Sequence, residues 1–585
     1  MLLTIILGSV MMAFFEGIAI PTGSIDVPVP GQYIYFFRFQ NWAVILIAAL
    51  IPLLLKSDTI GHFFVRFDEG GGLGKRGKAG LFLALFSLSL AVHFFILLQM
   101  YLTDDESAYR FTSQLLATGR LKAASFPMKE FFDRIFMIND GRFYAQYYYG
   151  WPFLLAIGEF IGIPYIVNSA LFALSALLLY EVIKSFTSAI WALAGTLFFA
   201  FSPLMLVGSA TYLSHTATTF FFLVFLYFYG KFENNNDDTT HSPLMIMALA
   251  GGAILLIRPY TAVLLCMPFV VMTVIRCIRK RIFSGCAGFF SVGLVVCALF
   301  FFINHLVYGS PLGSGYGNYE TYAKANKFVF SYWNPTPVPL TDFQPPFFSV
   351  ARPYEILEIF LSTFTRMGFD GVMVPVTMLF VVAIFSGIRL GIPYFTAFIV
   401  MLLGHSIWPD PGIDTFGPVH LSETVPLGIL FFITLCHRFD TPATRFLRQR
   451  GIPGKHGGMA VVSAVLICST LCYLPPKLIN ISIMAKNIST PYRFVRKSGI
   501  HNAVVFSSVP FVQQVSIYPL HHFRYWRDNP SAALDDDIIW VNDFSLEKNR
   551  ELRRVFPGRE FYKMAWTERG TRLEFIRLPK NDEQK

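Results

Sequence analysis

Long apolar runs recur along the chain and constrain its fold more than any other feature. A helix needs about twenty apolar residues to cross a lipid bilayer, and runs near this length predict about thirteen spans. They are 2–20, 41–55, 79–101, 165–183, 189–207, 213–230, 243–257, 260–275, 283–303, 371–388, 391–407, 424–437 and 458–474. The shorter apolar segment 151–163 is typical of a re-entrant or interfacial helix, as are parts of 110–136. The chain is therefore predicted to be an all-α polytopic membrane protein, with an α/β domain only at its C-terminal end.

Composition excludes a string of soluble domains, which the length of 585 residues alone would allow. Hydrophobic residues make up 54% of the chain and charged residues 14%, whereas soluble chains carry roughly 25% charged residues. The formal net charge is +10, but the basic residues lie in short connections and form no basic face with interleaved aromatics. We therefore expect membrane lipids as partners and no nucleic acid.

The basic clusters predict the orientation of the chain in the membrane. Lys and Arg gather in the connections 56–78, 276–281 and 438–455. Alternating the spans from a cytoplasmic N-terminus places all three on the cytoplasmic side, as the positive-inside rule requires. The segments that the same alternation places outside are 102–164, which contains the acids at 104–106, and 304–370, 408–423 and the tail from 475.

The predicted spans and connections divide the chain into parts. Residues 1–78 hold the first two spans and a cytoplasmic loop, and residues 79–474 form the transmembrane core with its external loop 102–164. A glycine-rich stretch at 68–76 superficially resembles a phosphate-binding loop, but no Ser or Thr follows its lysine and no strand precedes it. We therefore expect a flexible cytoplasmic linker there.

The tail, 475–585, differs from the rest of the chain in its short buried strands. The segments 502–506 and 537–541 are apolar runs typical of such strands, and 573–576 predicts a final one. Ser545 is a suitable N-cap for a helix that follows it. The tail is therefore predicted to be a small external α/β domain.

Polar side chains gather at the predicted external ends of the spans. They are Asp104, Asp105, Glu106, Tyr212, Ser214, His215, Arg258, Asn304, His305, His420 and Glu423. Polar groups are costly at a membrane edge, so each is a candidate for function. Structural alternatives stay open: the acid triplet can be a solvated stop signal, Arg258 can snorkel to the interface, and His215 can be a satisfied polar residue. Glu423 can pair with His420 one helical turn away.

This set of residues suits the transfer of a sugar from a lipid carrier. No nucleotide-activated sugar or ATP is present outside a cell, so an external membrane enzyme uses a lipid-linked donor. A polyprenyl-phosphate donor needs no general acid, because its phosphate leaves readily; one carboxylate then takes the proton of the acceptor hydroxyl. Cationic groups stabilise the departing phosphate. Asp105 is the candidate base, and Arg258 and His215 are the candidate phosphate partners.

A series of short motifs follows in order along residues 80–440. Its members are Thr103-Asp104-Asp105-Glu106-Ser107-Ala108-Tyr109, Leu115-Leu116-Ala117-Thr118-Gly119-Arg120-Leu121, Asp140-Gly141-Arg142-Phe143-Tyr144, Gly150-Trp151-Pro152, Ser202-Pro203, Ser209 to His215, Arg258-Pro259-Tyr260-Thr261-Ala262, and Gly417-Pro418 through Glu423 to Pro426. The series resembles GT-C fold glycosyltransferases, and among them bacterial members similar to the protein O-mannosyltransferases and the lipid A aminoarabinose transferases. The first two spans of this chain look like additions to that family core.

The resemblance implies roles for the three acids. In the family the Asp of the Asp-Glu pair is the catalytic base, and it falls here on Asp105. Asp104 and Glu106 are then supporting acids. The resemblance also implies a transfer that inverts the anomeric configuration.

The resemblance further bears on phosphate and metal binding. Related transferases often carry a Lys, thought to meet the donor phosphate, where this chain has Gln146, so Arg258 and His215 are expected to take most of that role. Some branches of the family need a divalent metal and others do not; a divalent metal stays possible, and no metal ligand or other cofactor is assigned. The seven Cys residues have no CxxC spacing, so no metal knuckle is expected from them.

The sequence therefore predicts a glycosyltransferase of the bacterial inner membrane. It would move a sugar from a polyprenyl-phosphate donor to a glycolipid, a surface glycan or a protein on the periplasmic side. One alternative is a transporter or flippase of lipid-linked sugars. Such a protein is expected to have internal repeats and acids at mid-membrane, and neither is evident in the sequence. Another is an oligosaccharide polymerase or ligase, which uses pyrophosphate-linked donors and loops rich in Arg and His.

Overall fold

The structure of the chain is a computed structural model, and most of the residues that it describes are helical. The described residues are 29–55, 58–134, 136–234, 241–325, 328–331, 334–339, 353–408, 412–414, 416–449, 457–507, 529–567 and 572–579. The predicted first span, 2–20, lies outside them.

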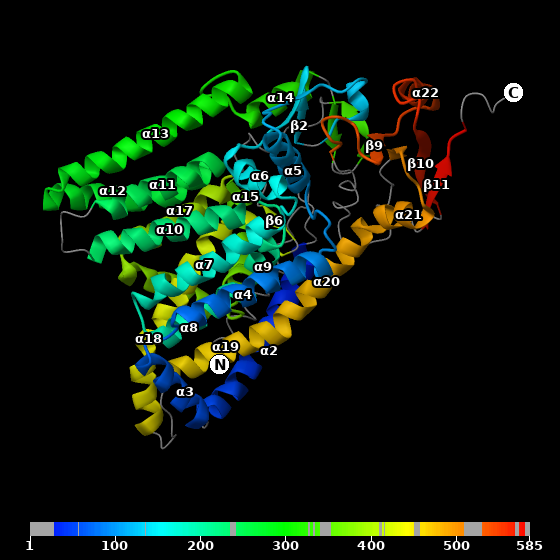
Figure 1. Cartoon of the computed structure of the whole chain (residues 1–585). Coiled ribbons are helices and arrows are strands. Elements are labelled where there is room, and N and C mark those ends of the chain that lie inside the picture. The colour runs from blue at the N-terminus through cyan, green and yellow to red at the C-terminus, as the bar shows by residue number, and fades with distance from the viewer. Residues whose placement is uncertain are drawn as a thin grey trace.

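Long helices form the body of the molecule (Figure 1). They are α2 (Val29–Leu55), α4 (Lys75–Ala91), α7 (Ile166–Lys184), α8 (Ala189–Phe201), α10 (His215–Asn234), α11 (Ser242–Ile257), α12 (Pro259–Lys280), α13 (Phe283–Tyr308), α15 (Pro353–Arg366), α16 (Thr377–Ser386), α17 (Ile392–Ser406), α18 (Val425–Gln449), α19 (Gly457–Cys468) and α20 (Leu474–Ile488). Shorter helices and single turns connect them: α3 (Asp58–Glu69), η1 (Val92–Ile96), α5 (Asp104–Ala117), η2 (Lys129–Phe131), α6 (Gly150–Phe160), α9 (Pro203–Ser209), α14 (Gly315–Ala325), η5 (Met367–Gly371), η6 (Gly387–Leu390), η7 (Val419–Thr424), η8 (Ser469–Tyr473), α21 (Thr490–Ser498) and α22 (Leu546–Arg553).

The helices confirm a multi-pass membrane protein, with fewer clear spans than the sequence predicts. Six stretches in the described part of the chain are long and apolar enough to cross a membrane: Lys75–Ile96, Ile166–Lys184, Pro259–Lys280, Phe283–Tyr308, Val419–Pro442 and Gly457–Ile488. The α8–α9 pair, bent by 62°, makes a seventh if it is one span. Four further apolar helices are shorter. The total of about thirteen spans stays a prediction.

Small residues allow the helices to approach closely. α10 packs between α7 and α11, and α11 in turn packs on α13. A Cβ atom on Gly252 of α11 would lie 2.7 Å from Val296 Cγ1 of α13, and one on Gly195 of α8 would lie 2.4 Å from Ile183 Cδ1 of α7. Such contacts are typical of helix packing in membranes, where van der Waals contact rather than the hydrophobic effect drives association.

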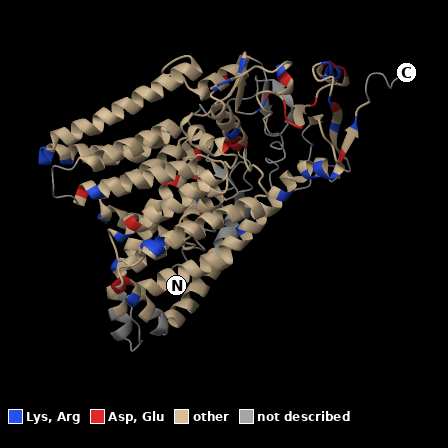
Figure 2. Ribbon diagram, viewed as in Figure 1, with Lys and Arg blue, Asp and Glu red and all other residues tan. Residues whose placement is uncertain are grey.

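The bundle has two chemically different ends. α12 has 22 residues and is about 33 Å long; Arg258 precedes its first residue, and Arg279 and Arg281 lie at its other end. Figure 2 shows the basic turn between α12 and α13 at the far end of the bundle from α5. The ends that carry the acids and Arg258 are therefore opposite to a basic cluster, and the orientation in the membrane stays a prediction.

Short strands and helices cover the end of the bundle near α5. β1 (Ala123–Ala124), β2 (Met137–Asn139) and β3 (Arg142–Ala145) form an antiparallel sheet in the order β1-β3-β2. Two further antiparallel pairs are β4 (Phe328–Ser331) with β5 (Asn334–Pro339), and β6 (Ile413–Asp414) with β7 (Gly417–Pro418). α6 confirms the short helix predicted at 151–163.

The tail contains strands and a helix, and that it is a separate external domain stays a prediction. Its sheet has the order β11-β10-β8-β9 and consists of β8 (Ala503–Ser507), β9 (Ile538–Asn542), β10 (Glu560–Thr567) and β11 (Arg572–Arg577). β8 runs parallel to both of its neighbours, and β10 and β11 are antiparallel. Ser545 caps α22 by accepting a hydrogen bond from the Lys548 N–H at 3.3 Å. Arg134 ties this unit to the loop 102–164 by donating to Trp540 O at 2.5 Å and Asn542 Oδ1 at 3.2 Å.

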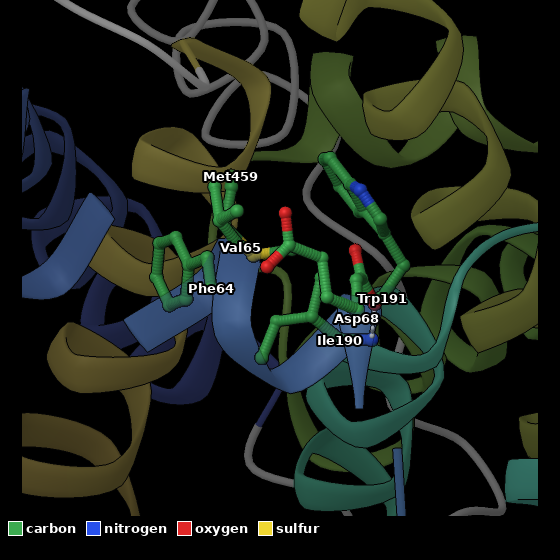
Figure 3. A pocket seen from close by; sticks show the side chains of 7 residues that line it. Phe64, Val65, Asp68, Ile190, Trp191 and Met459 are labelled. Atoms are coloured by element: carbon green, nitrogen blue, oxygen red, sulfur yellow. Dashed lines mark hydrogen bonds between the residues drawn. The ribbon is translucent and has the colours of Figure 1, made fainter. Parts of the chain in front are cut away.

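The glycine-rich stretch is a tight anchored turn, so the prediction of a flexible linker is wrong. Gly72 has φ +84°, and a Cβ atom there would lie 2.2 Å from the Tyr180 hydroxyl oxygen. That hydroxyl accepts a hydrogen bond from the Leu73 N–H at 3.1 Å. Asp68 caps α8 by accepting from the Ile190 N–H at 2.8 Å, beside a small cavity of about 190 Å³ (Figure 3). Only glycine permits this close approach at positive φ.

Candidate active site

The first turn of α5 carries the three acids, and Glu106 fixes its position. Glu106 and Thr103 form a capping box. The fully buried Glu106 carboxylate accepts from the N–H groups of Leu102 at 2.8 Å and Thr103 at 3.3 Å with one oxygen, and from the Tyr212 N–H at 2.8 Å with the other. The start of a helix favours negative charge. Glu106 therefore holds the helix start and ties it to the segment 210–214.

The segment 210–214 is held by side chains from several elements. His93 of η1 donates from Nδ1 to Ala210 O at 2.8 Å. Asn168 of α7 donates to the carbonyls of Thr211 and Leu213 at 2.8 and 2.9 Å, and Trp151 of α6 donates to that of Tyr212 at 2.7 Å. Buried carbonyl groups without hydrogen-bond partners would destabilise the fold. These bonds therefore stabilise the turn in this conformation. The turn sets the position of the residues that start α10.

Asp105 is half-buried and faces a group of tyrosines. The Tyr147 hydroxyl donates to Asp105 Oδ1 at 2.5 Å. Burial raises the pKa of Tyr147 well above its usual value, and the Asp105 charge adds to the effect. The ring of Tyr147 lies 4.6 Å from that of Tyr109 and 5.9 Å from that of Tyr316. Tyr147 therefore remains a protonated donor that orients the carboxylate.

Arg258 stands on the other side of the site, between α11 and α12. Its Nη1 donates to Ser214 Oγ at 3.4 Å and lies 3.3 Å from His215 Nε2. Its Nε donates to Thr261 Oγ1 at 3.3 Å and lies 3.6 Å from Glu423 Oε1. Contacts to side chains from the first turn of α12, from the start of α10 and from η7 hold the guanidinium in place. Arg258 is thus integrated into the protein and does not snorkel away from it.

Ser214 links the two halves of the site. Its hydroxyl lies 3.2 Å from the Tyr109 hydroxyl and accepts from Arg258. The Tyr109 ring packs on Tyr147, which binds Asp105. Burial raises the pKa of Tyr109 to about 12, while the Arg258 charge opposes that rise. A carboxylate and a guanidinium are therefore joined across one polar cluster at the end of the bundle.

Glu423 pairs with His215 and Arg258, not with His420. Its Oε1 lies 3.2 Å from His215 Nδ1. Its Oε2 is buried and has no hydrogen-bond partner among the described residues. The ring of His420 lies 6.1 Å from that of His215 and 5.3 Å from that of His405. The predicted pairing within one helical turn is therefore wrong, because the fold brings in partners from α10 and α12.

Gln146 and Tyr212 have contacts typical of structural residues. Gln146 is 2% exposed and donates its backbone N–H to Phe136 O at 2.9 Å. A Cβ atom on Gly315 would lie 2.1 Å from the Gln146 carbonyl oxygen, so α14 begins directly against it. The Arg110 guanidinium lies 4.9 Å from the centre of the Tyr212 ring. Asp104 is 9% exposed in the same turn as Asp105.

No metal centre is evident in the described part of the chain. There, no group of three or more His, Cys, Asp or Glu side chains is placed to hold a metal ion. The tyrosines Tyr109, Tyr147 and Tyr316 were not expected as site residues. Their sequence signal is weak, because tyrosine is common in the interfacial belts of membrane proteins.

Replacing Glu106 with Gln is expected to destabilise the protein by about 1–3 kcal/mol, because the amide can no longer accept three N–H bonds at once. Thermal unfolding of the purified protein in detergent measures the loss. Glu547→Gln on the exposed face of α22 is the matched control and should leave the melting temperature unchanged. An unchanged melting temperature for Glu106→Gln would show that these bonds do not support the fold.

Comparison with known proteins gives one family model and several solved structures. The model, described as "Domain of unknown function (DUF6311)", matches residues 151–341. No curated protein matches the chain.

The solved structures share little sequence identity with the chain. ArnT from Cupriavidus metallidurans bound to undecaprenyl phosphate is 13% identical, with a TM-score of 0.47, covering 85% of this chain and 94% of that one. The mycobacterial arabinofuranosyltransferase AftD is 14% identical, with a TM-score of 0.42, covering 83% and 33%. The oligosaccharyltransferase AglB from Archaeoglobus fulgidus, in complex with an inhibitory peptide and a dolichol-phosphate, is 11% identical, with a TM-score of 0.40, covering 86% and 75%. Each of these three matches covers more than 80% of this chain.

Proposed function

We propose that the protein is a membrane glycosyltransferase that moves a sugar from a polyprenyl-phosphate donor to an acceptor hydroxyl. The observation that carries this proposal is the joining of Asp105 to Arg258 through Tyr147, Tyr109 and Ser214 at one end of the bundle. A base and a phosphate-binding cation are the two groups that such a transfer needs. Both occur here in a cluster made of residues from several helix ends.

The proposed reaction is a single displacement. Asp105 takes the proton of the acceptor hydroxyl as its oxygen forms a bond to the anomeric carbon of the sugar. The bond between that carbon and the phosphate oxygen breaks, and the lipid phosphate keeps the electron pair. Arg258, held by Glu423 and next to His215, stabilises the charge on the phosphate. Attack from the face opposite to the phosphate inverts the configuration, and Asp104 and Glu106 support the turn that carries the base.

The proposal includes a location in the cell. The acids, the site and the α/β tail would lie on the periplasmic side of a bacterial inner membrane, with the N-terminus in the cytoplasm. The basic turn between α12 and α13, far from α5, supports this orientation. The first 78 residues would add helices to the core at 79–474, and the acceptor would be a glycolipid, a surface glycan or a protein.

Transfer from a labelled lipid carrier tests the proposal. The full chain is reconstituted in right-side-out and inside-out vesicles with a panel of labelled polyprenyl-phosphate sugars and membrane extract as the source of acceptors. We expect label to leave the carrier and appear on an acceptor, from one side of the membrane only. Movement of the intact lipid-linked sugar across the bilayer without transfer would instead identify a flippase. Activity only with pyrophosphate-linked donors would indicate a polymerase or ligase.

Replacing Arg258 with Gln is expected to lower transfer by a factor of about 10²–10³, the effect of removing one group that stabilises a developing anion. Arg258→Lys should retain part of the activity, because it keeps the charge but loses the planar fork. Arg279→Gln, at the opposite end of α12, is the matched control. In Arg258→Gln the buried Glu423 loses its cation, which can also destabilise the fold. The double variant Arg258→Gln/Glu423→Gln separates the two effects, because its melting temperature should return towards that of the natural chain while its transfer activity should stay low.

A further inference from the structure

A cleft separate from the Asp105–Arg258 cluster lies where two helices leave the membrane-spanning part of the chain. Its volume is about 500 Å³, and its walls are the segment after α4 and the joint between α20 and α21. The lining residues are Phe94, Leu98, Gln99, Met100, Tyr101, Ile488, Ser489, Tyr492, Arg493 and Arg496. Both walls are ends of apolar stretches, Lys75–Ile96 and Gly457–Ile488. The cleft is therefore at the edge of the membrane.

The polar part of the cleft is cationic. Arg493 and Arg496 are one turn apart on α21, and none of the lining residues is acidic. Arg493 uses one donor, Nη2, for the Lys486 carbonyl at 3.2 Å, and a guanidinium has five. Arg496 has no ion pair or hydrogen bond with any residue that the structure describes. Two arginines without a carboxylate favour a phosphate, which they can bind with paired hydrogen bonds.

The surface beside the cleft is apolar and open to lipid. Ile479 and Ile483 of α20 are 59% and 51% exposed, and Phe95 of η1 is 75% exposed. These residues precede the cleft on both of its walls, towards the membrane-spanning part of each helix. Acyl chains can therefore lie along them while a headgroup reaches the arginines. A free anion would gain nothing from this apolar surface.

The backbone of one wall is strained. Leu98 and Gln99 are consecutive non-glycine residues with φ values of +53° and +61°. Each costs roughly 1–2 kcal/mol relative to ordinary backbone, and strain of this kind gathers at ligand sites. The two residues follow η1 and line the cleft opposite the residues of α21. Tyr101, two residues after Gln99, accepts a hydrogen bond from Arg110 of α5 at 3.4 Å, so the wall also touches the helix that carries Asp105.

We infer that this cleft binds the phosphate headgroup of a membrane lipid. Arg493 and Arg496 would hold the phosphate, and the exposed face of α20 and η1 would hold the acyl chains. The lipid can be a resident anionic phospholipid or a phosphate-bearing lipid acceptor, since both present the same group. The inference does not depend on the proposed transfer, because it concerns binding at a different place.

Binding of phosphatidylglycerol to the purified full chain in neutral detergent tests the inference, with phosphatidylcholine and inorganic phosphate for comparison. We expect Arg493→Gln/Arg496→Gln to weaken phosphatidylglycerol binding by about tenfold or more, since each cation near a membrane contributes about 1 kcal/mol to anionic lipid binding. Lys486→Gln/Lys497→Gln is the matched control: it removes the same charge from exposed positions of α20 and α21 that lie outside the cleft. This lysine variant should bind phosphatidylglycerol about as tightly as the natural chain does.

The same measurement has outcomes that overturn the inference. Equal weakening by both double variants would indicate diffuse attraction and no site, and equal competition by inorganic phosphate would indicate an anion site without lipid. If the arginine variant does not fold, Gln99→Glu places a negative charge in the opposite wall and should weaken binding while leaving the arginines in place. Unchanged lipid binding in both Gln99→Glu and the arginine variant would refute the site. In the transfer assay with a labelled sugar donor, label on the bound lipid identifies that lipid as an acceptor, and its absence identifies a resident lipid.

Discussion

Replacing Asp105 with Asn is expected to lower the rate of sugar transfer by a factor of about 10²–10⁴, the contribution of a general base. Asn keeps the size of the side chain and can still accept the Tyr147 hydroxyl bond, so the fold should not change. The rate with a labelled lipid-phosphate sugar and the binding constant for the donor are measured together. The rate of transfer should fall, whereas the binding constant for the donor should not change, because the base acts on the acceptor.

Asp140 provides a matched control for Asp105. It belongs to the same loop, and its Oδ2 accepts a tyrosine hydroxyl bond, from Tyr144 at 3.2 Å. Asp140→Asn therefore makes the same chemical change in a similar tyrosine pair away from the cluster of Arg258. Transfer at the natural rate by Asp105→Asn would rule out the base, and equal losses in both variants would indicate damage to the loop.

Replacing Asp370 with Asn is expected to lower the free energy of unfolding by about 3–5 kcal/mol, because it leaves buried cations without their counter-ion. Asp370 is fully buried in η5 and pairs with Arg366 of α15. Its Oδ1 lies 3.0 Å from Lys477 Nζ and accepts the Tyr473 hydroxyl bond. Ser202, between α8 and α9, donates to its carbonyl at 2.8 Å. The carboxylate of Asp370 thus joins α15 to the η8–α20 segment, and its backbone carbonyl joins them to the start of α9.

Unfolding of the reconstituted protein by heat or by a denaturing detergent measures this loss. A second variant, Asp370→Asn/Lys477→Met, removes one of the cations as well and should recover part of the stability. Failure of the double variant to recover any of it would indicate that the loss comes from packing and not from charge. A single variant as stable as the natural chain would contradict the role of the pair.

Local patterns predicted much of the fold. Ser545 indicated where a helix begins in the tail, and the hydrogen bond that its hydroxyl accepts from the Lys548 N–H is the physical reason. The strands at 502–506 and 537–541 were recognisable because short apolar runs between polar turns are typical of buried strands. The number of spans was harder, since apolar length alone does not reveal where a helix bends, as between α8 and α9.

The site could be predicted only in part. Arg258, His215 and Glu423 were expected at one edge, and the structure brings them within contact of one another. Their pairing was not readable, because it depends on how α10, η7 and α12 pack. Tyr147 was not predicted as a site residue, although its neighbour Gln146 was. Only the folded loop shows that Tyr147 is the residue of the two that contacts Asp105. The roles of Asp104, Asp105 and Glu106 in catalysis stay predictions.

The turn at 210–214 has a consequence for how the protein matures. Its carbonyls take their partners from η1, α6 and α7, and one of its N–H groups bonds to α5. All of these partners precede the turn in sequence, so a growing chain already contains every one of them when residues 210–214 are added. Glu423 follows His215 by 208 residues, so the turn can be complete well before the carboxylate that pairs with His215 is made.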